Sequence, residues 1–369
     1  MSEIYNLVEI MSTQIDFQAG KIEDMKIAPL GNEILVKYKV KNITKIERID
    51  LQTKRVTGEF DLPGNSLWTT FNYSPDGKYL IIVSYVPNTD ARRDYSASEE
   101  ESYKYMITNI YETQSYDNKL SDFQTDIGGA IIPLSDSVLH ISEDNLFFFV
   151  CLNSVSINVY DFQTCEEVYD LTMSDIEPFG EDHDFIQSFE VLSYENEVLE
   201  CIALLKNKVI YNKNSDIYKT EEIDNLNRLI LVSENKNFFY ISNENSLIKI
   251  AINDEDDLND SFRLKDITVK PLELKLAYLD FIKLVHHDSQ IVGYKTDGEI
   301  FIINNDDEDD LLTIDIPINS SYDNSLFKLD YSKFSNKLVA ISYFPIQNAL
   351  NIYLYSYDEI IEKNALKRK

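Results

Sequence analysis

A short pattern recurs along the whole chain and constrains its fold more than any other feature. In each copy an apolar residue and a serine precede a polar turn, and a run of apolar residues follows. Tyr73-Ser74-Pro75-Asp76-Gly77-Lys78, for example, leads into the apolar run from Tyr79 to Val83. Four more copies open at Ile141-Ser142, Leu192-Ser193, Val232-Ser233 and Tyr331-Ser332, and two with the serine replaced open at Ile27-Ala28 and Val285-His286. The chain therefore contains seven units of one kind.

The spacing of these units is typical of a β-propeller. Their mean step is about 51 residues, within the range of one propeller blade. Each copy predicts the hairpin between the two inner strands of a blade, with a buried, nearly continuous apolar second strand. Third strands are expected at residues 45–51, 105–111, 156–162, 208–211, 247–252, 299–303 and 351–355, with a weaker fourth strand in most blades. The sequence predicts an all-β fold, a seven-bladed β-propeller, with six or eight blades as alternatives.

The repeated units predict one domain rather than several. Repeat units that close on one another form a single domain, although 369 residues could hold two or three of average size. We place this domain at residues 23–363, with blades at 23–62, 67–124, 137–173, 184–224, 227–268, 277–318 and 326–363. Residues 364–369 form a basic tail that is expected to fray, with a nuclear signal as the alternative.

Residues 1–22 are predicted to lead into this domain and to supply a closing strand. An open propeller has an unpaired edge, so Ile15 and Phe17 are expected to add an outer strand to the last blade. Ile4, Leu7, Val8 and Met11 have helical spacing, so a short helix or an irregular lead is expected before that strand.

Three segments resemble the WD40 repeat family. Residues 71–80, Phe-Asn-Tyr-Ser-Pro-Asp-Gly-Lys-Tyr-Leu, are similar to the first hairpin of such a repeat. Residues 157–164 resemble a later strand of the repeat, with Tyr160 in place of the family's tryptophan, and residues 46–53 repeat that pattern with Asp50 at the aspartate position. The tryptophan–aspartate pair is missing from the later units, and the Gly-His signature is missing throughout. The resemblance implies a propeller fold.

Charge and composition limit the partners and the compartment. The chain has 34 basic and 64 acidic residues and a formal net charge of −30, which repels nucleic acids and anionic membranes and attracts basic proteins. The alternative is that acidity only keeps a tyrosine-rich β protein in solution. The sequence begins without a secretory signal pattern, and Cys151, Cys165 and Cys201 have no paired spacing. We therefore expect buried thiols in a cytoplasmic protein, with a nuclear one as the alternative.

Two acidic runs are the first candidate binding site. They consist of Asp254, Glu255, Asp256 and Asp257, and of Asp306, Asp307, Glu308, Asp309 and Asp310. Both runs fall between the third and fourth strands of adjacent blades, so we expect them side by side on one face, where they could bind a basic segment of a partner protein. Two solvated turns without a partner are the alternative. Neither run has the glycine and glutamate spacing of an EF-hand loop, and we expect neither metal nor cofactor.

An insertion in the second blade is the other candidate site. Residues 86–103 join the second strand to the third and are expected on the face opposite the acidic runs. The insertion contains residue types that are enriched at interface hot spots, namely Arg92, Arg93, Tyr95 and Tyr103. A loop without a binding role is the alternative.

Catalytic motifs are not visible in the sequence. Its four histidines, His140, His183, His286 and His287, are accompanied by no nucleophile elbow, and CxxC and HExxH motifs are lacking. The leading hypothesis is a non-enzymatic protein–protein interaction scaffold that uses the loops on the propeller faces. The alternative is an acidic protein that escorts a basic ribosomal or histone-type client or neutralises a cationic toxin. The third hypothesis is a propeller hydrolase, because a central carboxylate pair would be hidden among 64 acidic residues.

Overall fold

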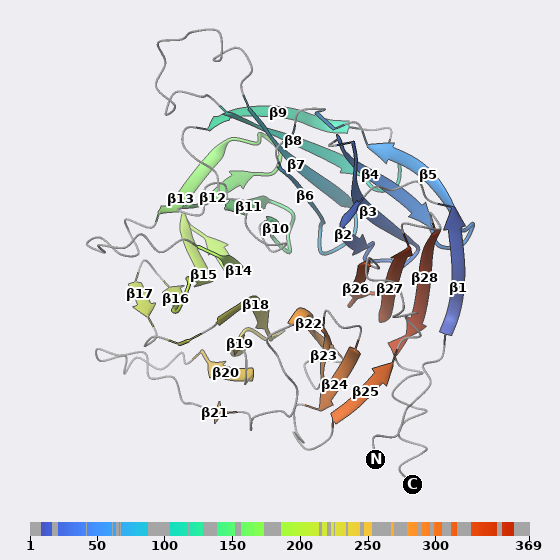
Figure 1. Cartoon of the computed structure of the whole chain (residues 1–369). Helices are drawn as coiled ribbons and strands as arrows, with labels where there is room; N and C mark the ends of the chain where they lie inside the picture. The colour runs from blue at the N-terminus through green and yellow to red at the C-terminus, as the bar shows by residue number, and fades with distance from the viewer. Residues whose placement is uncertain are drawn as a thin grey trace. The chain divides into compact units, whose positions relative to one another are not determined.

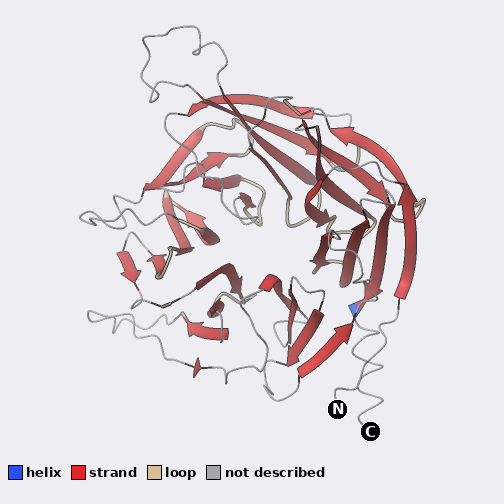
Figure 2. Ribbon diagram, in the orientation of Figure 1, coloured by secondary structure: helices blue, strands red, loops and turns tan. Residues whose placement is uncertain are grey.

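The computed structural model shows a chain built from β-strands (Figure 2). It describes residues 9–16, 21–41, 43–60, 62–63, 66, 68–87, 104–116, 119–127, 139–151, 156–172, 186–213, 216–219, 223–224, 226–233, 235–243, 247–252, 267–268, 279–285, 290–295, 299–304, 311–315, 326–344 and 349–357. The elements of this part of the chain are all strands, which confirms the predicted all-β class. No helix within these ranges is both long and apolar enough to cross a lipid bilayer.

The chain divides into two compact units. Unit 1 comprises Met1–Gly64 and Tyr278–Lys369, and unit 2 comprises Asn65–Ala277. The described residues form seven four-stranded sheets, three in unit 1 and four in unit 2. The number of these sheets equals the number of repeated units in the sequence.

Unit 1 contains the sheets β2-β3-β4-β5, β22-β23-β24-β25 and β1-β28-β27-β26 (Figure 1). Their strands are β1 (Glu9–Asp16), β2 (Lys21–Ile27), β3 (Glu33–Val40), β4 (Ile43–Asp50), β5 (Arg55–Phe60), β22 (Leu279–Val285), β23 (Gln290–Lys295), β24 (Glu299–Asn304), β25 (Leu311–Asp315), β26 (Leu326–Ser332), β27 (Lys337–Phe344) and β28 (Ala349–Ser356). The N-terminal strand β1 is the outer strand of its sheet. It pairs antiparallel with β28, with Glu9 opposite Tyr355 and Asp16 opposite Ala349.

Unit 2 contains four sheets, each made of consecutive strands of the chain. Their strands are β6 (Trp68–Tyr73), β7 (Tyr79–Pro87), β8 (Lys104–Glu112), β9 (Lys119–Ile127), β10 (Leu139–Ile141), β11 (Phe147–Cys151), β12 (Ser156–Asp161), β13 (Glu167–Thr172), β14 (Ser188–Glu195), β15 (Val198–Leu204), β16 (Val209–Lys213), β17 (Asp216–Lys219), β18 (Leu226–Val232), β19 (Phe238–Asn243), β20 (Leu247–Ala251) and β21 (Ile267–Thr268).

The predicted third strands are confirmed in every sheet. They are β4, β8, β12, β16, β20, β24 and β28, and their bounds lie within about two residues of the expected ranges. The repeated sequence pattern likewise joins the first strand of a sheet to the second, as in the antiparallel pair of β6 and β7.

Neighbouring sheets within a unit pack through buried apolar side chains. In unit 1, Ile34 of β3 belongs to one buried cluster with Val339 of β27. In unit 2, the run Leu80–Val83 of β7 is fully buried, and Ile81 belongs to one cluster with Phe148 of β11. A strand that is covered on both faces needs consecutive rather than alternating apolar residues, which explains the apolar runs of the sequence pattern.

Candidate functional site

The segments that join the first and second strands of a sheet carry ordered polar side chains. We call these six-residue segments the first turns; they are residues 28–33 and 332–337 of unit 1, and 74–79, 142–147 and 233–238 of unit 2. In the β6–β7 turn, Ser74 Oγ accepts a hydrogen bond from Tyr79 N at 2.9 Å and donates one to Asp76 Oδ1 at 2.7 Å. The same two bonds recur for Ser142 with Phe147 N and Asp144, and for Ser233 with Phe238 N and Asn235. The serine of the sequence pattern therefore closes the turn.

Four of the first turns also share a left-handed residue. The third position after the opening residue has a φ of 64° at Gly31, 72° at Gly77, 59° at Asn145 and 58° at Lys236. Glycine adopts this conformation without strain, and asparagine tolerates it better than most residues do. The turn of residues 332–337 has its positive φ one position later, at Asn336.

The hairpin of β14 and β15 differs from the sequence prediction. Both strands extend beyond Ser193, and a two-residue turn joins them, with φ values of 51° at Asn196 and 64° at Glu197. A two-residue hairpin of this type requires positive φ at both positions. Ser193 therefore does not close a turn, and its hydroxyl donates to Glu200 across the strand pair at 3.0 Å.

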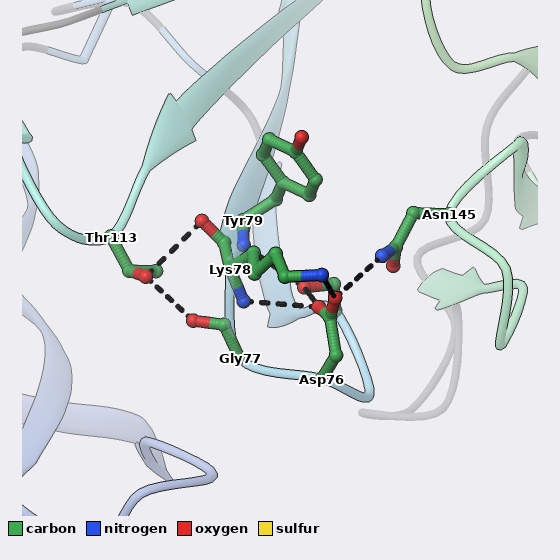
Figure 3. Close-up of polar contacts among 7 residues, drawn as sticks. Asp76, Gly77, Lys78, Tyr79, Thr113 and Asn145 are labelled. Carbon is green, nitrogen blue, oxygen red and sulfur yellow. Dashed lines mark hydrogen bonds and ion pairs between the residues drawn. The ribbon is translucent and has the colours of Figure 1, made fainter.

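Asp76 joins two neighbouring first turns of unit 2 (Figure 3). Its Oδ2 accepts a hydrogen bond from Asn145 Nδ2 at 2.9 Å and lies 2.7 Å from Lys78 Nζ, while Oδ1 accepts from Lys78 N at 3.0 Å. Partial burial is the largest single influence on the pKa of Asp76 and raises it, but the bonds from Lys78, Ser74 and Asn145 together lower the pKa to about 2. Asp76 is therefore ionised at neutral pH and serves as a structural acceptor.

The first turns are also tied to the end of the third strand of the same sheet. Thr113, which follows β8, donates from Oγ1 to Gly77 O at 2.5 Å and to Lys78 O at 3.1 Å (Figure 3). Its backbone N also donates to Lys78 O, at 2.9 Å. Equivalent backbone bonds run from Leu51 to Asn32, from Phe162 to Leu146, from Ile252 to Asn237 and from Tyr357 to Asn336. A backbone hydrogen bond from the end of the third strand thus helps to fix the tip of each of these hairpins.

A polar residue two positions before the turn connects each of three sheets to its neighbour. Asn72 Nδ2 donates to Leu139 O at 2.9 Å, and Asp330 Oδ2 accepts from Ile27 N at 2.7 Å. His140 occupies the same position, and its Nδ1 lies 3.5 Å from Glu190 Oε2 of the next sheet. The position of His140 thus matches that of two residues that link sheets, which favours a structural role for it.

The two first turns of unit 1 that the structure describes interlock. Ser332 Oγ donates to Pro29 O, and Lys337 Nζ donates to Gly31 O at 3.1 Å. A Cβ atom added to Gly31 would lie only 2.3 Å from Ser335 Oγ and 2.9 Å from Ser335 Cβ, so any other residue there would force the neighbouring turn to shift. At the tips of these turns, the side chains of Leu30 and Phe334 are 56% and 68% exposed.

The aspartates of the WD40-like segments serve a second kind of turn, between the third and fourth strands. Asp50 Oδ1 accepts from Thr53 N at 2.5 Å, and Asp161 Oδ1 accepts from Thr164 N at 2.8 Å. These backbone bonds are the main cause that lowers the pKa of each aspartate. Both carboxylates therefore act as hydrogen-bond acceptors within their own turns.

The three cysteines are buried and free, as the sequence predicts. Burial raises the pKa of Cys201 to about 12, so this thiol is protonated and unreactive at neutral pH. Among the described residues, no group of three or more His, Cys, Asp or Glu side chains is placed to hold a metal ion. Three of the four histidines, His183, His286 and His287, lie outside the described residues.

The binding residues predicted from sequence all lie outside the described part of the chain. These are both acidic runs, Asp254–Asp257 and Asp306–Asp310, and the four insertion residues Arg92, Arg93, Tyr95 and Tyr103. Their grouping on two faces stays a prediction. The sequence reasoning did not single out Leu30 and Phe334, although an alignment of the repeated units would have revealed both.

Comparisons with known proteins identify the fold. No protein-family model matches the chain, and no curated protein matches its sequence. Among solved structures, the chain is similar to the β-propeller domain of Cps50 (Swd1) from Myceliophteria thermophila, with a TM-score of 0.58 and 9% sequence identity. The match covers 94% of this chain and 99% of that domain. Together with the four-stranded antiparallel sheets, this similarity shows that the chain has a β-propeller fold.

Proposed function

We propose that the chain is a non-enzymatic scaffold that binds another protein through the turns and loops of its propeller sheets. The observation that carries this proposal is the construction of the first turns, which hold their tips in fixed positions by repeated hydrogen bonds from serine to aspartate or asparagine. A rigid set of exposed tips loses little conformational entropy when a partner binds. The polar groups that form these turns are used for structure, which favours binding over chemistry.

The carboxyl groups support the same proposal. In the described part of the chain, Asp50, Asp76 and Asp161 have a lowered pKa, and turn hydrogen bonds explain each shift. A general acid in a hydrolase needs the opposite, a pKa raised toward neutrality. The buried free thiols further support action in a reducing compartment such as the cytoplasm.

The test is affinity capture of the full chain from its native cells, followed by reconstitution with each purified candidate. We expect a stoichiometric complex with at least one protein, measurable by calorimetry with purified components. A chain that binds none of the candidates, and that turns over a small-molecule glycoside or ester in a substrate panel, would contradict the proposal.

A second candidate function is sequestration of a basic protein, which the net charge of −30 favours. Charge complementarity of this kind raises association rates and is sensitive to salt. Replacement of the acidic residues in Asp254–Asp257 and Asp306–Asp310 by serine and asparagine would then abolish binding of a basic client such as a histone. Binding that is indifferent both to these replacements and to salt would exclude this candidate.

A further inference from the structure

One position differs between the first turns of unit 2 and the two described first turns of unit 1. Two residues after the opening residue, the turns of unit 2 carry Asp76, Asp144 and Asn235. Each of these side chains accepts the serine hydroxyl and a backbone N–H two residues further on, at 3.0 Å for Asp76 and Asp144 and 3.2 Å for Asn235. Aspartate and asparagine are favoured in turns for this reason. The same position holds Leu30 and Phe334 in the turns of residues 28–33 and 332–337 of unit 1. The repeated unit at Val285-His286, whose turn lies outside the described residues, has Asp288 there in its sequence.

Both apolar residues are largely exposed. Leu30 is 56% exposed and Phe334 is 68% exposed, the latter being the most exposed large apolar side chain of the described residues. Single exposed apolar residues are normal on protein surfaces. Here, however, two of them replace the residue type that the turn favours, and local choices that conflict with the fold are expected at functional sites.

The interlocking of the two turns makes these residues part of one surface. The bonds from Ser332 Oγ to Pro29 O and from Lys337 Nζ to Gly31 O fix the turns against each other. Leu30 directly precedes Gly31, and Phe334 directly precedes Ser335, whose Oγ faces Gly31. The two apolar residues therefore lie on turns that are fixed against each other.

The charges on these turns are opposite to those of the chain as a whole. Lys333 and Lys337 lie in the second turn, and the only acidic residue of the two turns is Glu33. The carboxylate of Glu33 is 12% exposed and lies 3.9 Å from Arg48 Nε, so it is largely covered. At physiological salt the Debye length is about 8 Å, which means that nearby lysines outweigh distant acidic residues at this surface.

We propose that Leu30, Phe334, Lys333 and Lys337, the apolar–basic patch, bind a short segment of a partner protein in which an apolar side chain is flanked by acidic residues. This inference rests on the proposed scaffold function and names the class of partner for one surface. The apolar anchor would cover Leu30 and Phe334, and the acidic flanks would face the two lysines. A second copy of the chain is a poor occupant, because two chains of charge −30 repel each other.

The experiment measures binding of synthetic peptides to the full chain by fluorescence anisotropy. One set of peptides carries a single Phe, Leu or Trp between acidic residues, and two comparison sets carry the same anchors between lysines or between serines. We expect the acidic set to bind best, with a loss of about tenfold or more in the double variant Leu30→Asn with Phe334→Asn. Reversal of one charge by Lys333→Glu should weaken the acidic set and not the serine set.

Leu146→Asn is the matched control, because Leu146 is a 50% exposed leucine on a first turn of unit 2. This variant should bind the acidic set as the unmodified chain does. Equal loss in both variants, or no preference for the acidic set, would overturn the proposal. Binding of the lysine-flanked set alone would overturn the proposed patch while leaving the scaffold function in place. Failure of all peptide sets, together with failure of the native capture, would contradict both the patch and the scaffold function. Self-association that the double variant abolishes, measured by sedimentation, would also overturn it by identifying a second copy as the occupant.

Discussion

The first turns of unit 2 and those of unit 1 use the same short segment in different ways. In unit 2 each turn is closed by its own side chains, with Ser74 and Asp76 as the most fully connected example. In the two described first turns of unit 1, Ser332 and Lys337 donate hydrogen bonds to the neighbouring turn, and Leu30 and Phe334 are exposed. Ser332 Oγ also accepts from Ser335 N within its own turn, at 3.2 Å. The comparison shows that a repeated turn can carry an exposed apolar residue at the acceptor position where bonds to a neighbouring turn support it.

The largest expected effect tests whether the turns of unit 1 depend on their close approach. Gly31→Ala places a Cβ 2.3 Å from Ser335 Oγ and 2.8 Å from Lys337 Cδ, on a residue with a φ of 64°. Left-handed backbone and the clash together should cost about 2–4 kcal/mol in the free energy of unfolding. Urea unfolding followed by circular dichroism measures this loss.

Gly58→Ala is the control in the same sheet. An added Cβ there would meet Arg48 Nη2 at 3.6 Å, which is ordinary contact. This variant should change the unfolding free energy by less than about 1 kcal/mol. Equal effects of the two substitutions would show that the approach of the turns in unit 1 is not tight.

The next effect tests whether the turns of unit 2 depend on their own acceptors. Asp76→Leu gives the β6–β7 turn the residue type of unit 1 and removes the acceptor for Ser74, Lys78 and Asn145. We expect the free energy of unfolding to fall by about 1.5–3 kcal/mol. Hydrogen exchange of the peptide that spans residues 74–80 should accelerate, and unchanged protection there would contradict the turn's dependence on Asp76.

Asp76 also gives the turn a pH dependence of known sign. Its pKa is about 2 in the folded chain against an ordinary 3.8. Its contribution to the free energy of unfolding is therefore complete above about pH 4 and falls as the pH drops toward 2. The stability difference between the unmodified chain and Asp76→Asn should therefore be constant from pH 7 to 5 and narrow below about pH 4. A difference that narrows between pH 7 and 5 would mean that the carboxylate titrates near neutrality instead.

A smaller effect concerns a feature that both units share. Lys337 donates to Gly31 O in unit 1, and Lys236 donates to Leu192 O in unit 2, so each lysine ties its turn to the neighbouring sheet. Lys337→Met and Lys236→Met keep most of the side-chain volume and remove the donor. Each should lose about 1 kcal/mol of unfolding free energy. A loss in unit 1 alone would sharpen the comparison, because it would show that only the turns of unit 1 need their neighbours.

The sequence predicted the fold more completely than the surfaces. Burial of β7 on both faces requires a run such as Leu80–Val83, and serine-closed turns require residues such as Ser74 and Asp76, so both appear as a repeated pattern. From sequence, the two-residue turn at Asn196 and Glu197 could not be distinguished from a serine-closed first turn. A serine at position 193 is compatible with either a turn or a strand.

The exposed tips were missed for a physical reason. A repeated sequence pattern reflects the residues that the fold requires. Leu30 and Phe334 are apolar and lie near strands, so the sequence alone is compatible with their being strand residues, although their turn position favours a polar residue. An alignment of the repeated units is needed to place them in turns, and their exposed fractions then show that they are not strand residues. The interlocking bonds, from Ser332 to Pro29 and from Lys337 to Gly31, join residues about three hundred positions apart and have no local signature.

The smallest expected effect is the reciprocal of the Asp76 substitution. Leu30→Asp places in unit 1 the residue type that closes the turns of unit 2, on a turn that has the same positive φ one residue later, at Gly31. The new carboxylate can accept the backbone N–H of Asn32 as Asp76 accepts that of Lys78, and it removes an apolar side chain from water. The unfolding free energy should therefore stay the same or rise by up to about 0.5 kcal/mol, as thermal unfolding would measure. A loss of about 1 kcal/mol or more would mean that Leu30 stabilises its turn, and the exposed tip would then need no partner to explain it.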